Sequence, residues 1–150
     1  MKPSSDNKIT LIRGILSGTM AGLIAMLVML IFVNIYRTTM NVDAYYMAIS
    51  PLVIIVAIPI LLAIFGMLLS VLSMYVSKGI TWFTLLFLLL TVFGVIMDAV
   101  HPQQGPLFTG SKGLLFGVEV ITGLAAALLI PYLAQHPGIF MNKLGEKASE

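Results

Sequence analysis

Four long runs of apolar residues, separated by short and more polar stretches, set the pattern of the whole sequence. A helix that crosses a membrane needs about 20 mainly apolar residues, because each residue adds about 1.5 Å of rise and the hydrocarbon core is about 30 Å thick. All four runs reach this length. The pattern therefore predicts four membrane-spanning helices, over residues 9–36, 48–77, 80–100 and 112–134.

The connections between these runs are short. Helices joined by short loops usually lie side by side and antiparallel. We therefore expect one integral membrane domain over residues 1–150, with an all-α fold: a four-helix transmembrane bundle built from two tandem helical hairpins.

The composition supports a membrane location. The chain is 59% hydrophobic and only 9% charged, whereas a soluble domain has about 25% charged residues. A chain with so few charged residues cannot cover itself with a water-compatible surface. We therefore expect the lipid bilayer to surround the protein. The net charge of +2 comes without a basic cluster, which argues against binding to nucleic acid, and the absence of cysteine excludes disulfides and thiolate metal sites.

The distribution of basic residues predicts the orientation. If the N-terminus lies inside, six of the eight Lys and Arg residues fall on the inner side and two on the outer side. Inner loops of membrane proteins carry an excess of Lys and Arg. We expect both termini to lie inside, in a multi-pass protein of a bacterial cytoplasmic membrane. The inner residues are Lys2, Lys8, Arg13, Lys78, Lys143 and Lys147, and the outer ones are Arg37 and Lys112.

Small residues recur at helical spacing in the predicted spans, which places each set on one helix face. In lipid, such faces allow helix backbones to approach closely. Two interpretations stay open: the faces form the inside of the bundle, or the glycine run of the first span binds a membrane-protein partner or a second copy of the chain. The helix-packing glycines are Gly14, Gly18 and Gly22 of that run, with Gly66, Gly94 and Gly123 of the later spans.

Glu119 is the acid that lies deepest in a predicted span. It is about two turns into the fourth helix, roughly 10 Å below the outer boundary, where a carboxylate costs about 2.5 kcal/mol or more unless it is neutralised, paired or hydrated. Asp98 and His101 lie near the same, outer end of the third span. The three residues predict a proton or cation site, or a pocket for a polar ligand. The alternative is a structural acid that holds helices in register, with Asp98 at a helix end and His101 in a loop.

Other chemistry is not indicated. The two histidines, His101 and His136, fall at opposite membrane faces and cannot ligate one haem, and a metal site would show a denser ligand cluster. The serines of the second span lie near the inner face, far from the acids. We therefore expect no cofactor, no metal and no catalytic residues, and an enzyme is not favoured.

Three segments carry a resemblance to a known group of proteins: GILSGTMAGLIAMLV, PLVIIVAIPILLAIFGMLLSVLS and GVEVITGLAAALLIPYLAQ. They are similar to an uncharacterised family of bacterial four-helix membrane proteins, a domain of unknown function. The similarity covers roughly residues 11–135 and implies the same four-helix fold, without an activity. Small multidrug transporters also have four helices, but their essential acid lies in the first helix, which here contains none.

The sequence thus favours a small membrane protein without enzymatic activity, either an accessory subunit of a membrane complex or a self-associating protein. The alternative is a small transporter or channel-like protein with an outer-facing proton or cation site at Glu119, Asp98 and His101.

Overall fold

A computed structural model describes residues 9–40, 50–100, 112–136 and 138. Its helices are α1 (Leu11–Met40), α2 (Pro51–Tyr75), α3 (Gly79–Val100), α4 (Lys112–Leu124) and α5 (Ile130–Gln135). A π-helical segment, Ala125–Leu129, joins α4 to α5 in one continuous rod, the α4–α5 rod.

The structure confirms four helices long and apolar enough to cross a membrane, which indicates a multi-pass membrane protein. Their ends differ from the predicted ones by only a few residues, and the predicted start of the second span at residue 48 lies outside the described residues. The four stretches are Leu11–Thr39, Pro51–Tyr75, Gly79–Val100 and Gly113–Gln135.

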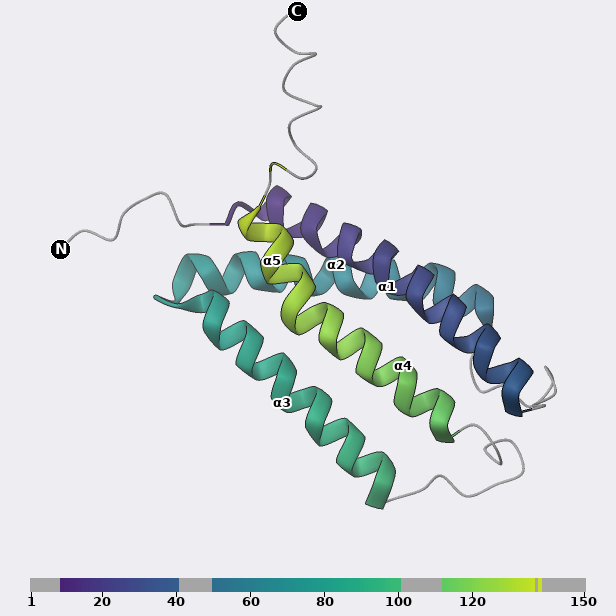
Figure 1. Ribbon diagram of the computed structural model, residues 1–150. Helices are drawn as coiled ribbons and strands as arrows, with labels where there is room; N and C mark the ends of the chain where they lie inside the picture. The colour runs from purple at the N-terminus through teal and green to yellow at the C-terminus, as the bar shows by residue number, and fades with distance from the viewer. Residues whose placement is uncertain (1–8, 41–49, 101–111, 137, 139–150) are drawn as a thin grey trace, which may run out of the picture.

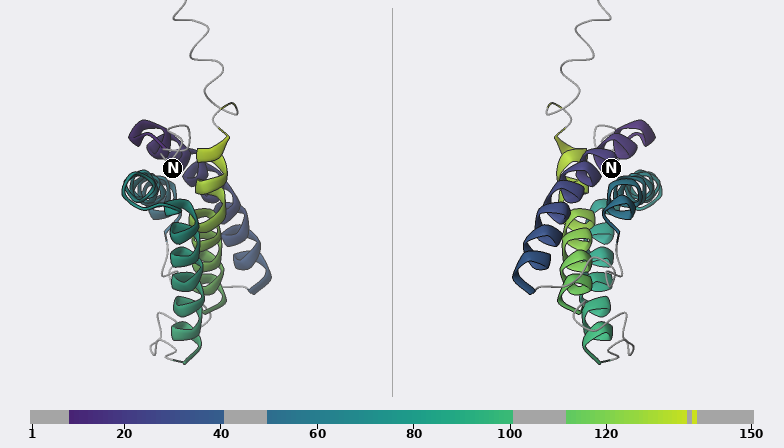
Figure 2. Two further views of the ribbon diagram at one scale, coloured as in Figure 1. Left: turned by 90° about the vertical axis from the view of Figure 1, so that its left-hand side faces the viewer. Right: turned by 90° about the vertical axis from the view of Figure 1, so that its right-hand side faces the viewer.

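Along the chain, α1, α2, α3 and the α4–α5 rod run in alternating directions, and α3 lies beside α4 (Figures 1 and 2). The start of α1, the turn between α2 and α3, and the end of α5 lie at one end of the molecule, which we call the Arg13 end (Figure 1). The end of α1, the start of α2, the end of α3 and the start of α4 lie at the opposite end, which we call the Asp98 end (Figure 1). α2 runs obliquely to α3 and α4 (Figure 1).

Local chemistry explains where α2 begins and how the chain turns into α3. Ser50 caps the helix by accepting a hydrogen bond from the Leu52 N–H, and Pro51 occupies the first turn, where its missing N–H costs nothing. After α2, Lys78 adopts a left-handed conformation (φ 85°), which reverses the chain. Gly79 is required next, because a Cβ there would lie 2.8 Å from the Ser73 Cα.

The glycine run of α1 packs against α2 of the same chain. A Cβ on Gly18 would lie 2.9 Å from the Ala63 Cα, and one on Gly22 would lie 2.6 Å from the Pro59 Cα. Gly14, Gly18 and Gly22 are all buried. The glycine face is therefore occupied within the chain and allows the backbones of α1 and α2 to touch.

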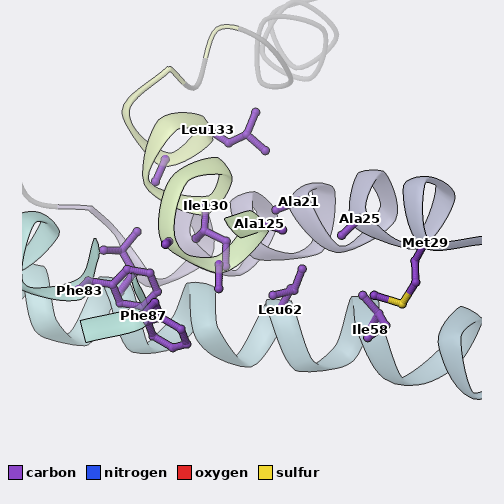
Figure 3. Packing of buried hydrophobic residues seen from close by; sticks show 14 of the residues in the cluster. Ala21, Ala25, Met29, Ile58, Leu62, Phe83, Phe87, Ala125, Ile130 and Leu133 are labelled. Carbon is purple, nitrogen blue, oxygen red and sulfur yellow. The ribbon is translucent and has the colours of Figure 1, made fainter. Parts of the chain in front are cut away.

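Buried apolar side chains from every helix meet inside the molecule. The contact joins small residues of α1, larger aliphatic residues of α2, two phenylalanines of α3 and the start of α5 (Figure 3). In lipid this packing acts through van der Waals contact rather than removal from water. Its members include Ala21, Ala25, Met29, Ile58, Leu62, Phe83, Phe87, Ala125, Ile130 and Leu133.

The π-helical segment was not predicted from the sequence, and Pro131 explains it. Proline has no N–H and its ring clashes with the carbonyl four residues earlier, so the regular α-helical bond at this position is lost. The helix widens just before it, and the Ile130 N–H bonds instead to the Ala125 carbonyl. The alanines of this wide turn, Ala125, Ala126 and Ala127, are buried against the other helices.

Candidate functional site

α3 and α4 meet in an antiparallel register that sets a glycine of one helix against a polar side chain of the other. A Cβ on Gly94 of α3 would lie 2.6 Å from the Glu119 Cδ of α4. One turn deeper, a Cβ on Gly123 of α4 would lie 2.8 Å from the Thr91 Cβ of α3. Each glycine thus provides the space for the polar group opposite.

The Glu119 carboxylate lies between the two helices, directly against the Gly94 backbone, and is partly buried. Asp98 lies one turn further along α3, on the same face as Gly94 and towards the Asp98 end. It is also partly buried, and it is close enough for its charge to act on that of Glu119. The structure therefore brings two carboxylates together on the α3–α4 seam.

Neither carboxylate has a hydrogen bond or ion pair with another of the residues that the structure describes. The Thr91 hydroxyl donates to the carbonyl of Phe87 in its own helix (2.7 Å), which leaves its oxygen able to accept or to coordinate. Over the described ranges, no group of three or more His, Cys, Asp or Glu residues is placed to hold a metal ion.

The polar part of the seam ends below Thr91. There the Phe87 ring packs at a tilt against the rings of Phe83 and Phe65, with centroids 4.5 and 4.6 Å from its own. Asp98 to Thr91 is seven residues, or about 10 Å of helix at 1.5 Å per residue. The polar groups therefore form a short row along the seam, from the Asp98 end to an aromatic cluster.

Of the three residues that the sequence singled out, the structure joins Glu119 and Asp98. His101 lies outside the described residues. The sequence missed Thr91 as a neighbour of the site and the role of Gly94 as the surface on which Glu119 rests, although both share a helix face with Asp98.

No protein-family model, no curated protein and no solved structure matches the chain. The resemblance to a family of bacterial four-helix membrane proteins stays a prediction.

Proposed function

We propose that the protein binds a proton or cation at Glu119 and Asp98 and acts as a small transporter or channel-like protein. The observation that supports this is the Glu119 carboxylate, which lies against Gly94 on the α3–α4 seam with the charge of Asp98 nearby. The proposed surroundings are a four-helix bundle in a bacterial cytoplasmic membrane, with both termini inside.

The energetics favour a cationic ligand. A carboxylate within a membrane span costs about 2.5 kcal/mol or more, and a second acid close by adds repulsion. A bound proton or cation relieves both terms, whereas a purely structural acid needs hydrogen-bond partners that the described residues do not supply. For this reason the geometry favours the transporter over the accessory subunit that the sequence placed first.

The proposed orientation opens the site to the outside. Of the described basic residues, Arg13 and Lys78 lie at one end of the molecule and Arg37 and Lys112 at the other. The proposed orientation rests on the six basic residues of the whole sequence that fall on the side of the Arg13 end, against two on the other. With the Arg13 end inside, Asp98 faces the outer surface and the cluster of Phe65, Phe83 and Phe87 separates the site from the inner side. Passage of a cation then requires those rings to part.

The experiment uses the full-length protein in liposomes. Proton uptake is followed with an internal pH-sensitive dye after an imposed pH gradient, and uptake of sodium and potassium is measured in parallel. We expect flux above that of empty liposomes, and loss of this flux in Glu119→Gln, which keeps the shape of the side chain and removes its charge. Glu146→Gln, the same change outside the four spans, serves as the control. Flux at the level of empty liposomes, or a Glu119→Gln variant as active as wild type, overturns the proposal.

A self-associating or accessory protein is the second candidate, and α3 is the feature that favours it. Only 11% of the apolar window of α3 is buried, against 28–33% for the other three spans. Because the glycine run is occupied by α2, association with a partner or a second copy would use the open face of α3 instead. Leu89 and Phe93 on this face are exposed.

A further inference from the structure

An open groove of about 620 Å³ runs between α1 and the α4–α5 rod. Ala25 and Ala125 form its buried floor, while Val28, Leu128 and Tyr132 line its sides with about half of their surface exposed. The small side chains of the floor and the larger side chains of the sides together form the groove. The side chains that line it are apolar apart from the hydroxyl group of Tyr132.

The groove has the length of one membrane leaflet. Its lining on the α4–α5 rod extends from Ile121 to Tyr132, which is about 16 Å of helix at 1.5 Å per residue. This is about half of the ~30 Å hydrocarbon core. Tyr132, the one polar side chain of the groove, belongs to α5, and the end of α5 lies at the Arg13 end of the molecule (Figure 1). These dimensions suit a single acyl chain that lies along the rod.

Arg13 lies on the same face of α1 as the groove-lining residues Ile24 and Val28, beyond one end of the groove. Going from Arg13 to Ser17, Ile24 and Val28, the spacings are four, seven and four residues, which keeps all four on one side of the helix. Ile24 and Val28 line the groove. Arg13 therefore lies beyond the groove, towards its Tyr132 end.

The register between α1 and the rod agrees with this position. Gly113 faces the Tyr36 ring, and Gly117 faces the Phe32 ring, so four residues forward along α4 correspond to four residues back along α1. Continued to the ends of both helices, this register places His136 near the level of Arg13. The His136 ring stacks on Tyr132, with centroids 4.5 Å apart.

The charge at this end is complementary to a phosphate group. The Arg13 Nε is buried and has no hydrogen-bond partner, and a buried donor without an acceptor is unfavourable. Among the described residues of the Arg13 end, the charged side chains are Arg13 and Lys78, whereas Asp98 and Glu119 lie towards the other end. Guanidinium groups bind phosphate oxygens through paired, charge-assisted hydrogen bonds.

We propose that Arg13 and the groove together bind one anionic phospholipid, with the phosphate on the Arg13 guanidinium and one acyl chain between α1 and the α4–α5 rod. In the orientation proposed above, this lipid belongs to the cytoplasmic leaflet, where anionic lipids attract basic residues. The site is separate from Glu119 and does not depend on the proposed transport.

Native mass spectrometry of the full-length protein in detergent micelles tests this site. Phosphatidylglycerol and phosphatidylcholine with identical acyl chains are titrated separately, and bound lipids are counted. We expect one phosphatidylglycerol to bind about tenfold more tightly than phosphatidylcholine. Both lipids carry the phosphate group, but the choline cation of phosphatidylcholine offsets its charge and repels the Arg13 guanidinium. Arg13→Gln should remove this preference, and Leu128→Trp, which fills the groove, should weaken the binding of both lipids.

Each variant has a matched control. Arg37→Gln makes the same change at the other end of α1, and Leu89→Trp makes the same change on the exposed face of α3; both should bind lipid as wild type does. If Arg13→Gln does not fold, Leu27→Cys in this cysteine-free chain carries a fluorophore beside the groove, because Leu27 is exposed and does not line it. Phosphatidylglycerol with brominated chains should quench this fluorophore more strongly than the brominated phosphatidylcholine. Equal binding of the two lipids by wild type, equal effects of a variant and its control, or equal quenching overturns the proposal.

Discussion

Alanine at Gly18 should destabilise the protein through the contact between α1 and α2. A Cβ at this position would lie 2.9 Å from the Ala63 Cα and 3.0 Å from the Leu62 carbonyl carbon. Non-bonded carbon atoms prefer separations of about 3.5–4.0 Å. Because the obstructing atoms belong to the backbone of α2, rotation of a side chain cannot relieve the clash, and the two helices must move apart.

The magnitude follows from comparison with a second glycine. Overpacking of a tight contact costs about 1–3 kcal/mol, but alanine also favours a helix over glycine by about 1 kcal/mol, which conceals part of the loss. Gly117→Ala makes the same change inside α4, where the new methyl group meets the Phe32 ring. This ring can rotate. Since both variants gain the same helix propensity, their difference in unfolding free energy isolates the backbone clash and should be about 1–3 kcal/mol.

Equilibrium unfolding by dodecyl sulfate in mixed micelles, followed by far-ultraviolet circular dichroism, measures this difference. Gly18→Ala should unfold at a lower mole fraction of dodecyl sulfate than Gly117→Ala, and Gly18→Leu should unfold earlier still. If the two alanine variants unfold together, the backbones of α1 and α2 are not in contact at Gly18 and the reasoning fails.

Two further predictions concern α2 and α3. Ser70 donates a hydrogen bond from α2 to the Thr10 carbonyl at the start of α1 (3.1 Å), so Ser70→Ala should lower the unfolding free energy in the same assay by about 0.6 kcal/mol, the average for such bonds in membranes. The Ser73 hydroxyl bonds within its own helix, so Ser73→Ala should lower the unfolding free energy less. The reverse order would contradict the role of the Ser70 bond. If α3 mediates self-association, Leu89→Cys should form a disulfide-linked dimer on oxidation in liposomes. Ile64→Cys, at an exposed position near the middle of α2, should not. Equal yields of the dimer from both variants on a denaturing gel would argue against association through α3.

The lengths of the spans and the faces of the glycines were predictable because both follow from local periodicity. The partner of the glycine run was not. A helix face formed by Gly14, Gly18 and Gly22 allows close approach of any helix. The spacing of the three glycines in the sequence does not say whether that helix belongs to this chain or to another. The choice depends on α2, whose Ala63 and Pro59 meet the glycines and had no visible link to α1 in the sequence.

The pairing of Glu119 with Gly94 was within reach of a simple register argument. Gly94 lies six residues before the end of α3 at Val100, and Glu119 lies six residues after Gly113, where the fourth span begins. Antiparallel neighbours that turn at the same level bring such positions together. The π-helical segment had a signal too, in Pro131, but a proline predicts a disturbed helix without saying whether the helix kinks, ends or widens.

The uneven packing of the four spans bears on how the proposed site would work. Phe83 and Phe87 of the aromatic cluster both belong to α3, so in the proposed mechanism a movement of α3 relative to its neighbours would part the rings. α3 is the least buried span, so its movement breaks fewer contacts than separation of α1 from α2, whose backbones touch at Gly18 and Gly22. The glycine run thus holds α1 and α2 in close contact, whereas the acids lie on α3, the least buried span, and on its neighbour α4. Transport at Glu119 therefore predicts motion of α3 against a fixed α1–α2 pair.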